Sequence, residues 1–472
     1  MVGGFLRDTL LGRPTVDVDL AVEGDALSLT RALVDGLGGS YVPLDTERGV
    51  ARALVPVGGG ARVVVDVATM QGDIHADLAR RDFTVNAMAV PLGRFLQRGW
   101  RRHLLDPWGG LADLERRRVR ALGEEVFPQD PCRLLRAVRL AATLGFQVDE
   151  ATLEAMRRHA ALVVNVAAER QREEFLRLLA APQACPWLYV MDDVGLLCAL
   201  VPELEEGRGV AQPREHYWDV LRHNIETVGA AERLLSRDGL SQEVLEEVPW
   251  DEEVARYFGE QVSDGHTRGT LLKVACLLHD VAKPASRSVE PSGRVRFFGH
   301  HTMGAETAQA ILRRLHMSGR GVELVRLMVE HHLRPNQMAQ PEEMPTQRAV
   351  YRYFRDLGEA AVGTLFLSMA DHLAARGPLL EFTNWRAHAR IIGYVLSTGF
   401  APTTGKPGRP AVRVLTGHDL MSELGLEPGP GLGRLLEALN EAQAAGEVST
   451  RAEALALARH ILARGPNDRR SE

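Results

Sequence analysis

The sequence has few cysteines, few lysines and no long hydrophobic run. Its four cysteines form no close pair, which argues against a disulfide framework or a zinc site and favours reduced thiols in the cytoplasm. No apolar run approaches the roughly 20 residues that cross a bilayer, and the N-terminus shows no signal peptide. Because the net charge is −6, a nucleic-acid partner would have to meet local basic patches. Arginine would form those patches, since the only lysines are Lys273, Lys283 and Lys406.

The first 92 residues alternate short β-rich runs with turns, which predicts a small α/β unit. Gly58-Gly59-Gly60 separates two of these runs and predicts a hairpin turn. A helix is predicted over 27–37. The predicted strands cover 17–22, 51–57, 62–68 and 87–91.

From Pro107 onward the hydrophobic pattern is helical almost to the end. A second helical block starts near Glu215, and we expect the acidic stretch 246–269 to be a poorly structured insertion within it. Residues 402–410 have the composition of a linker, and a helical tail follows. The 472 residues are too many for one core, so we expect several domains. The helices predicted before the second block cover 130–144, 149–158, 168–180 and 190–200.

Two carboxylates stand one residue apart in the first predicted strand. Because side chains alternate along a strand, Asp17 and Asp19 point to one face, while Val16, Val18 and Leu20 point into the core. The carboxylates then lie about 6–7 Å apart, which suits a pair of Mg²⁺ ions bridging acids and phosphate oxygens. The alternative is an edge strand with one hydrated face.

Residues around this strand favour phosphate binding. Gly3 and Gly4 precede a helix predicted to begin near Phe5, where the backbone can approach a triphosphate and helix-start N–H groups attract anions. Arg7 lies one turn into this helix. Asp66 ends a run of valines and is either a third acid on a neighbouring strand or a turn residue.

Three further segments follow in order: 80–89 (RRDFTVNAMA), 129–139 (QDPCRLLRAVR) and 169–175 (ERQREEF). Together with the Gly-Gly and Asp-Val-Asp segments, they resemble the signatures of class II tRNA nucleotidyltransferases and the related bacterial poly(A) polymerases. This resemblance covers residues 1–180 and is highly specific. It departs from the family in two places: Gln129 stands where a glutamate is usual, and the lead-in before the glycines is reduced to Met1-Val2.

The resemblance implies a role for each matching residue. Asp17 and Asp19 would be catalytic, with Mg²⁺. Asp130 and Arg133 would select C and A over G and U by presenting donors and acceptors like a base edge, on a helix that also carries Arg136 and Arg139. Asp130 is also predicted to cap that helix before Pro131. The nucleotide's phosphates and ribose would contact Gly3, Gly4, Arg7, Arg81, Asp82 and Asn86, although Asp82 could instead cap a helix.

Histidines and aspartates recur in the middle of the chain, at His223, His279-Asp280, His300-His301, His331-His332 and Asp371. This set resembles the HD metal-dependent phosphohydrolases, and its imidazole and carboxylate ligands suit a transition metal more than Mg²⁺. The resemblance implies that His223, His279, Asp280 and Asp371 hold one metal, and that Lys283 contacts phosphate. His300 and His332 would serve a second metal or the phosphate, with His301 and His331 as the alternatives.

These observations predict the domain organisation. We expect an α/β nucleotidyltransferase head with a small mixed sheet over 1–105 and an all-α neck and body over 106–212. An all-α HD domain follows over 213–395, and a linker with a helical tail occupies 396–472.

The resemblance implies template-independent addition of C and/or A (CC or CCA) to the 3′ ends of tRNA, together with an HD phosphohydrolase activity. CTP and ATP would be the substrates, and the tRNA 3′ end and acceptor arm the binding partner. The connector from Asp66–Thr69 to Asp77–Arg80 is shorter than in complete CCA-adding members, which resembles enzymes that add CC and leave the last A to a partner. Full CCA addition, A-only addition and poly(A) synthesis remain alternatives. Another alternative is an HD phosphatase or phosphodiesterase whose N-terminal unit only binds RNA. The last alternative is a non-catalytic RNA-binding protein.

Overall fold

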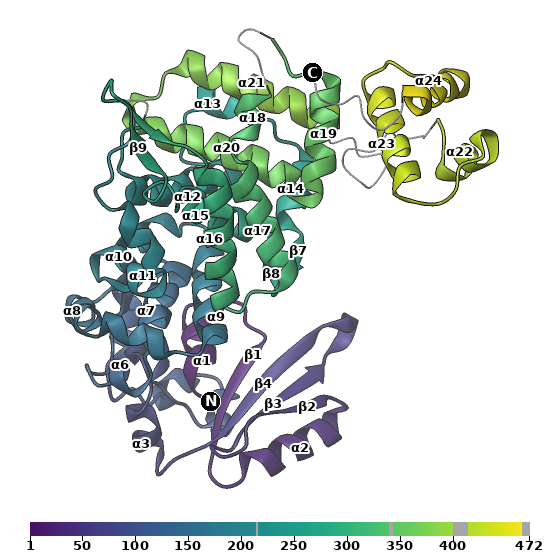
Figure 1. Cartoon of the computed structure of the whole chain (residues 1–472). Helices are drawn as coiled ribbons and strands as arrows, with labels where there is room; N and C mark the ends of the chain where they lie inside the picture. The colour runs from purple at the N-terminus through teal and green to yellow at the C-terminus, as the bar shows by residue number, and fades with distance from the viewer. Residues whose placement is uncertain (214–215, 339–342, 400–413, 465–472) are drawn as a thin grey trace. The chain divides into compact units, whose positions relative to one another are not determined.

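A computed structural model describes residues 1–213, 216–338, 343–399 and 414–464 (Figure 1). These residues form two compact units. The first contains 1–181 and 187–200, and the second contains 182–186 and the residues from 201 onward. The domain boundaries predicted at 105, 212 and 395 stay predictions. Among the described residues, no helix combines the length and apolar character that a membrane crossing needs.

A four-stranded mixed sheet forms the N-terminal part of the first unit, as predicted (Figure 1). The strand order is β1-β4-β3-β2, with β1 and β4 parallel and the other pairs antiparallel. Helix α2 (Ala26–Leu37) packs its Ala26 and Val34 against one face, where Val65 and Val67 meet them. The strands are β1 (Asp17–Val22), β2 (Ser40–Asp45), β3 (Val50–Pro56) and β4 (Arg62–Thr69).

The sheet confirms most of the predicted strands and corrects three details. β2 was missed, because it is an edge strand that contains Pro43 and exposes Val42 and Leu44. Residues 87–91 form no strand, since Ala89 makes only isolated β-bridges to Val2 and Leu105. Val16 was expected in the core but is 57% exposed, because β1 begins after it.

Helices fill the rest of the first unit, and α7, α8 and α9 match the predicted ones within two residues. The single helix predicted over 190–200 is wrong. Gly195 adopts φ +75° and separates two helices there, because this left-handed conformation ends a helix. The helices are α1 (Gly3–Leu10), α3 (Ile74–Ala79), α4 (Leu92–Phe95), α5 (Gly110–Glu115), α6 (Val126–Gln129), α7 (Cys132–Leu144), α8 (Glu150–His159), α9 (Ala168–Leu179), α10 (Cys185–Asp193) and α11 (Leu196–Leu200).

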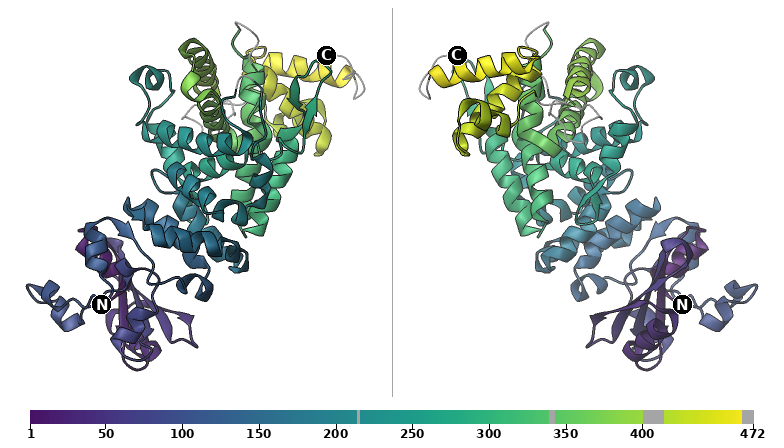
Figure 2. Two further views of the ribbon diagram at one scale, coloured as in Figure 1. Left: turned by 90° about the vertical axis from the view of Figure 1, so that its left-hand side faces the viewer. Right: turned by 90° about the vertical axis from the view of Figure 1, so that its right-hand side faces the viewer.

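The second unit is a helical bundle in which α12, α15 and α20 pack on one another and α16 runs beside α17 (Figures 1 and 2). The start predicted at Glu215 lies outside the described residues. The bundle helices are α12 (Val220–Ser236), α13 (Gln242–Glu246), α14 (Glu252–Gly259), α15 (Arg268–Leu278), α16 (His300–Arg314), α17 (Gly319–His331), α18 (Arg334–Gln337), α19 (Gln347–Leu357), α20 (Ala361–Arg376) and α21 (Phe382–Gly399).

The insertion predicted over 246–269 is wrong, because this stretch is ordered. It contains α14 and a small hairpin of β7 (Gln261–Ser263) and β8 (His266–Thr267). Asp251 caps α14, whose Val254 and Phe258 are buried. These buried residues stand four positions apart on one side of α14, but the acidic composition of the stretch misled the prediction.

Three helices form the tail: α22 (Gly417–Leu424), α23 (Pro430–Ala444) and α24 (Arg451–Arg464). They enclose a small core of their own around Leu420, Leu435 and Leu439. A capping box between Thr416 and Asp419 starts α22. The predicted linker at 402–410 lies outside the described residues.

Candidate active sites

The start of α1 lies against the carboxylate of Asp19 in the first unit. The Phe5 amide donates to Asp19 Oδ2 at 3.2 Å. Gly3 begins the helix with φ +67°, and a Cβ there would stand 2.9 Å from Asp19 Oδ2 and 3.0 Å from Arg81 Nη1. Both the backbone conformation and the close approach therefore require glycine at this position.

Three acids and one arginine share the face of the sheet opposite α2. Asp19 pairs with Asp66 in the parallel register of β1 and β4, and Asp17 precedes Asp19 on the same face. Arg52 lies opposite Asp66 on β3 and donates to both of its oxygens, at 2.7 and 2.9 Å. Sequence reasoning missed Arg52. It could have been found, because Arg52 and Asp66 are the same number of residues from Gly59 in the sequence, and a hairpin centred on Gly59 places them opposite each other.

This acidic face fits a divalent cation held by two carboxylates. Burial raises the pKa of Asp19, and the nearby Asp66 adds to the rise, so the ionised form lacks full compensation. Asp17 is exposed and open to an ion. Carboxylate oxygens are the ligands that Mg²⁺ prefers, and Mg²⁺ would supply charge stabilisation to a transferring phosphoryl group.

The three carboxylates of this face are not drawn together into a tight set of ligand atoms. Among the described residues, every set of three side chains whose ligand atoms lie within 4.8 Å of one another is in the second unit. Arg52 binds both oxygens of Asp66, and Asp19 lies beside Asp66 in the strand register. Asp17, Asp19 and Asp66 as metal ligands of the head stay predictions.

A continuous chain of polar contacts joins the residues assigned to the nucleotide. Arg7 Nη1 donates to Asn86 Oδ1 at 2.8 Å, and Asn86 Nδ2 donates to Asp82 Oδ1 at 3.1 Å. Arg136 Nη1 donates to the other Asp82 oxygen at 3.1 Å and its Nε donates to Glu174 at 3.0 Å. Burial alone would raise the pKa of Asp82, but the Arg136 guanidinium holds it below its ordinary value. Arg139 also pairs with Glu174.

Arg81 and the residues of the third motif have their own partners. Arg81 Nη2 donates to Asp77 at 3.1 Å. Asp130 accepts from the Cys132 amide at 3.2 Å, as a helix-capping residue does, and its other oxygen accepts from Arg170 at 2.7 Å. Arg133 donates to the backbone oxygens of Arg80 and Val126. Asp130 and Arg133 thus contact different partners in this structure.

Sequence reasoning assigned no role to Arg170 or Glu174. Both lie in the segment 169–175, and its resemblance to the family was the only sequence feature that pointed to them.

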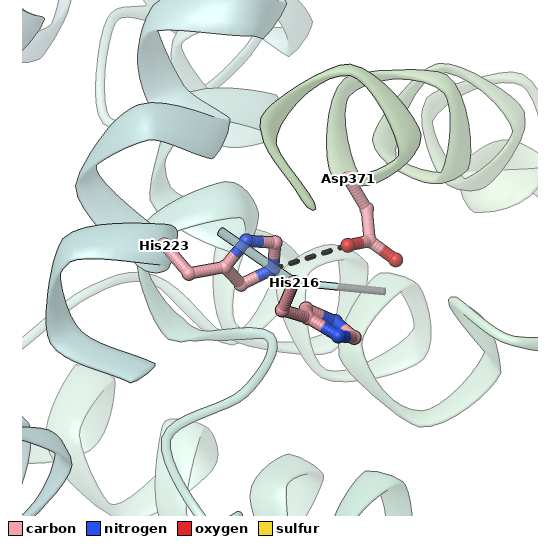
Figure 3. Close-up of side chains that lie close together, drawn as sticks. All are labelled: His216, His223 and Asp371. Carbon is pink, nitrogen blue, oxygen red and sulfur yellow. Dashed lines mark ion pairs between the residues drawn. The ribbon is translucent and has the colours of Figure 1, made fainter. Parts of the chain in front are cut away.

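Five helices and one preceding segment of the second unit bring histidines and aspartates together. His223 Nε2 lies 3.1 Å from Asp371 Oδ1 (Figure 3). It also lies 3.3 Å from His279 Nε2. Asp280 stands between two groups: His279 is 3.2 Å from one of its oxygens, and His300 is 3.4 Å from the other. His332 lies 3.8 Å from the same oxygen as His300. All the predicted ligands therefore meet at one site.

The imidazole rings are oriented for metal binding. The Nδ1 atoms of His279, His300 and His332 lie 2.7–2.8 Å from backbone carbonyl oxygens. Such a bond places the proton on Nδ1 and leaves the Nε2 lone pair facing the other ligands. His301 and His331 are not in the cluster, so the structure selects His300 and His332 from the two doubled positions.

The charges of this cluster call for a cation. The Asp280 carboxylate is buried among imidazoles, and its one contact with a lysine is from Lys283 Nζ, 2.5 Å from Oδ2. Burial opposes a charge on His279, but Asp280 and Asp371 raise its pKa to about 10, so a proton balances the carboxylates. Two overlapping ligand sets share Asp280, one with His223 and His279 and the other with His300 and His332. This fits two metal ions that would activate water and bind phosphate oxygens.

His216 is a further member that sequence reasoning missed. It forms a third set with His223 and Asp371 (Figure 3). Burial lowers its pKa to about 3, which keeps the imidazole neutral and able to act as a ligand. It precedes α12 in an irregular segment, so no helical spacing linked it to the other histidines.

Four protein-family models match separate segments of the chain. Residues 59–120 match the model of the poly A polymerase head domain, 145–207 match "Probable RNA and SrmB- binding site of polymerase A", and 252–376 match the HD domain. Residues 414–458 match a model of tRNA nucleotidyltransferase domain 2. A polymerase head followed by an HD domain defines the class: a nucleotidyltransferase with an appended HD domain.

Two relatives cover almost the whole chain. An A-adding tRNA nucleotidyltransferase of Deinococcus radiodurans is 34% identical, over 97% of this chain and 94% of that protein. A CC-adding tRNA nucleotidyltransferase of Thermus thermophilus is 35% identical, over 96% of this chain and 92% of that protein. The chain therefore belongs to the class II tRNA nucleotidyltransferase family, the family of the CCA-adding enzymes.

The fold has solved counterparts at lower identity. The Thermotoga maritima CCA-adding enzyme complexed with tRNA is 21% identical, with a TM-score of 0.62, over 98% of this chain and 90% of that one. A complex of a CCA-adding enzyme with CTP is 20% identical, with a TM-score of 0.64. These structures support the architecture of the chain.

Proposed function

We propose that this enzyme adds two C residues to the 3′ end of tRNA, using CTP, and leaves the terminal A to another enzyme. The relatives act on tRNA by name, and both CC-adding and A-adding proteins are among them. The choice between the two activities rests on the connector between β4 and α3. We place the reaction in the cytoplasm, in agreement with four free cysteines.

The connector is short and bonded along its length. Met70 N donates to the Val22 oxygen at 2.8 Å, and Gln71 accepts from Arg80 at 2.6 Å. Asp73 already caps α3, because its side chain accepts from Ala76 N. No long span of backbone is left to reach over the nucleotide and reposition Arg133 against adenine. This is the observation that favours CC addition over CCA addition.

The head residues divide the work of the reaction. Asp17 and Asp19 would hold Mg²⁺, which would stabilise the charge on the transferred phosphoryl group. Gly3, Gly4, Arg7 and Arg81 would bind the triphosphate, because their N–H groups suit phosphate oxygens. Arg7 donates a hydrogen bond to Asn86. A ribose at Asp82 and Asn86 would compete for these bonds, which links sugar binding to phosphate binding.

The test is extension of a tRNA that lacks all three terminal nucleotides, with CTP and ATP present together and products resolved at single-nucleotide resolution. We expect the products to stop at two added residues. Extension by three would overturn CC addition, and growth on tRNA already ending in CC would favour the A-adding alternative. An unrelated RNA serves as the control, because its extension with many A residues would indicate a poly(A) polymerase. Grafting a longer connector should restore addition of the last A.

We also propose that the HD domain hydrolyses phosphate esters with bound divalent transition metals or Mg²⁺, with nucleoside 2′,3′-cyclic phosphates as the first substrates to test. Water would add to phosphorus, one P–O bond to the ribose would break, and the released ribose oxygen would take a proton. The convergence of two ligand sets on Asp280 supports this proposal.

The HD proposal is tested with the double variant His279→Ala, Asp280→Ala. Metal-dependent hydrolysis should disappear while addition of C to tRNA survives. Wild-type protein that hydrolyses no phosphate ester with any divalent metal would overturn the proposal. Loss of both activities in a folded variant would mean that the two sites are coupled.

A further inference from the structure

The HD cluster opens into a pocket of about 370 Å³. Residues other than the proposed metal ligands form part of its walls. One wall is β10 (Val295–Phe297) with the turn before it, and another is the end of α20. The volume falls in the range of sites that hold a small organic ligand, so a nucleotide fits better than a bare phosphate. Phe297 and Leu333 give the pocket apolar surface.

The walls also carry three arginines, and one of them forms an ion pair among the described residues. Arg296 Nε donates to Glu290 at 3.0 Å. By contrast, Arg294 and Arg376 form no ion pair among the described residues, although both line the pocket. Lys283, on the same pocket, already contacts Asp280 and the Gln212 side chain.

These two guanidinium groups add positive charge beside Lys283, whose own charge is paired with Asp280. Metal ions in the cluster would balance the remaining carboxylate charge, so an anion in this pocket would be attracted by both arginines. A single phosphate at the metal cluster would be neutralised by the metals and Lys283, and the arginines would remain without a partner. Arginine is suited to phosphate because its planar fork can donate two parallel hydrogen bonds.

We propose that Arg294 and Arg376 bind a second phosphate of the HD substrate, while the first phosphate is hydrolysed at the metal cluster. The substrate class is then a nucleotide with phosphates on both sides of its ribose, such as a 5′-phosphorylated nucleoside 2′,3′-cyclic phosphate or the corresponding end of an RNA. This inference rests on the proposed hydrolase function and specifies its substrate.

The first experiment compares three substrates of the full chain in Mn²⁺: uridine 2′,3′-cyclic phosphate, the same compound with a 5′-phosphate, and p-nitrophenyl phosphate. We expect kcat/KM to be about tenfold higher with the 5′-phosphate than without it. The double variant Arg294→Gln, Arg376→Gln should remove this preference by raising KM, and it should leave the other two substrates unchanged. Arg287→Gln is the matched control, because Arg287 is an exposed arginine on the neighbouring strand β9 (Arg287–Val289) and does not line the pocket.

Two results would overturn the inference: no preference for the 5′-phosphate in the wild type, or an equal loss on all three substrates in the double variant. A short RNA with a 2′,3′-cyclic end distinguishes a polymer from a free nucleotide. A stronger preference for RNA would identify the second phosphate as the adjacent phosphodiester.

A binding experiment keeps the inference testable if no substrate is hydrolysed, a result that would count against the hydrolase function alone. Equilibrium dialysis with saturating CTP, which occupies the head, compares adenosine 3′,5′-bisphosphate with adenosine 3′-monophosphate. Tighter binding of the bisphosphate in the wild type, lost in the double variant, would support the second site. Equal affinity in the wild type would overturn it, and so would tighter binding of adenosine 5′-triphosphate than of the bisphosphate.

Discussion

The two sites of this chain prepare their metal ligands in different ways. In the head, Asp17 is exposed, Asp19 is bonded to the start of α1 and Asp66 is bonded to Arg52, and the three carboxylates form no set of ligand atoms within 4.8 Å of one another. In the HD domain, the histidines and aspartates converge and are largely buried. Buried ligands held by packed helices form a site before any ion arrives, whereas separated carboxylates need the ion and its nucleotide to complete the geometry. We therefore expect the HD domain to retain metal and the head to acquire it with its substrate.

The largest effect should come from removing one head carboxylate. Asp19→Ala or Asp17→Ala should lower the rate of C addition by about 10³-fold or more, because the metal would lose half of its protein ligands. Affinity for tRNA should stay near the wild-type value, since it depends on arginine contacts with phosphates, including the exposed Arg116 and Arg117. Single-turnover extension and filter binding measure the two quantities. A variant that extends tRNA at nearly the wild-type rate would contradict the metal assignment.

The next effect concerns metal retention. After desalting, the full chain should retain one to two transition-metal ions by elemental analysis, and Asp280→Asn should lose most of them. Asp19→Asn is the matched control, and its metal content should equal that of the wild type.

A brief treatment with EDTA should abolish C addition, and Mg²⁺ alone should restore it. Retained metal that falls equally in both variants would break the contrast between the sites.

Arg136 tests the network behind the nucleotide. Arg136→Met should raise KM for CTP about tenfold and lower the free energy of unfolding by about 2 kcal/mol, because Asp82 and Glu174 lose their shared partner inside the protein. The control is Arg177→Met, which breaks the exposed pair with Glu173 and should cost less than about 1 kcal/mol. Denaturant titration and steady-state kinetics give both values. Equal losses in the two variants would show that burial of the network contributes nothing.

The smallest effect separates backbone strain from contact at the start of α1. Gly3 and Gly12 both have positive φ, at +67° and +69°, but a Cβ at Gly12 meets nothing within 4 Å. Each alanine variant should lose about 1–2 kcal/mol of stability through the left-handed backbone. Only Gly3→Ala should also lower kcat for C addition, by about tenfold, because its Cβ would displace Asp19 and Arg81. Unchanged kcat in Gly3→Ala would mean that the close approach does not position Asp19.

The sequence by itself determined the parts of this protein that depend on local spacing. Strand alternation placed Asp17 and Asp19 on one face, the glycine run marked the hairpin between β3 and β4, and the motif residues identified the family. The HD ligands were recognisable because each sits in a short segment that forms one helix or its end. Local preferences and residue type were sufficient for these features.

Tertiary structure decided what depends on packing between distant segments. Three contacts join residues whose separation in the sequence gives no periodic signal. They are Arg52 with Asp66, Arg136 with Glu174, and His216 with Asp371. The choice of His300 and His332 over their neighbours follows from which side of each helix faces Asp280. Adjacent residues on a helix point in different directions, and only the packing of the helices determines which direction is inward.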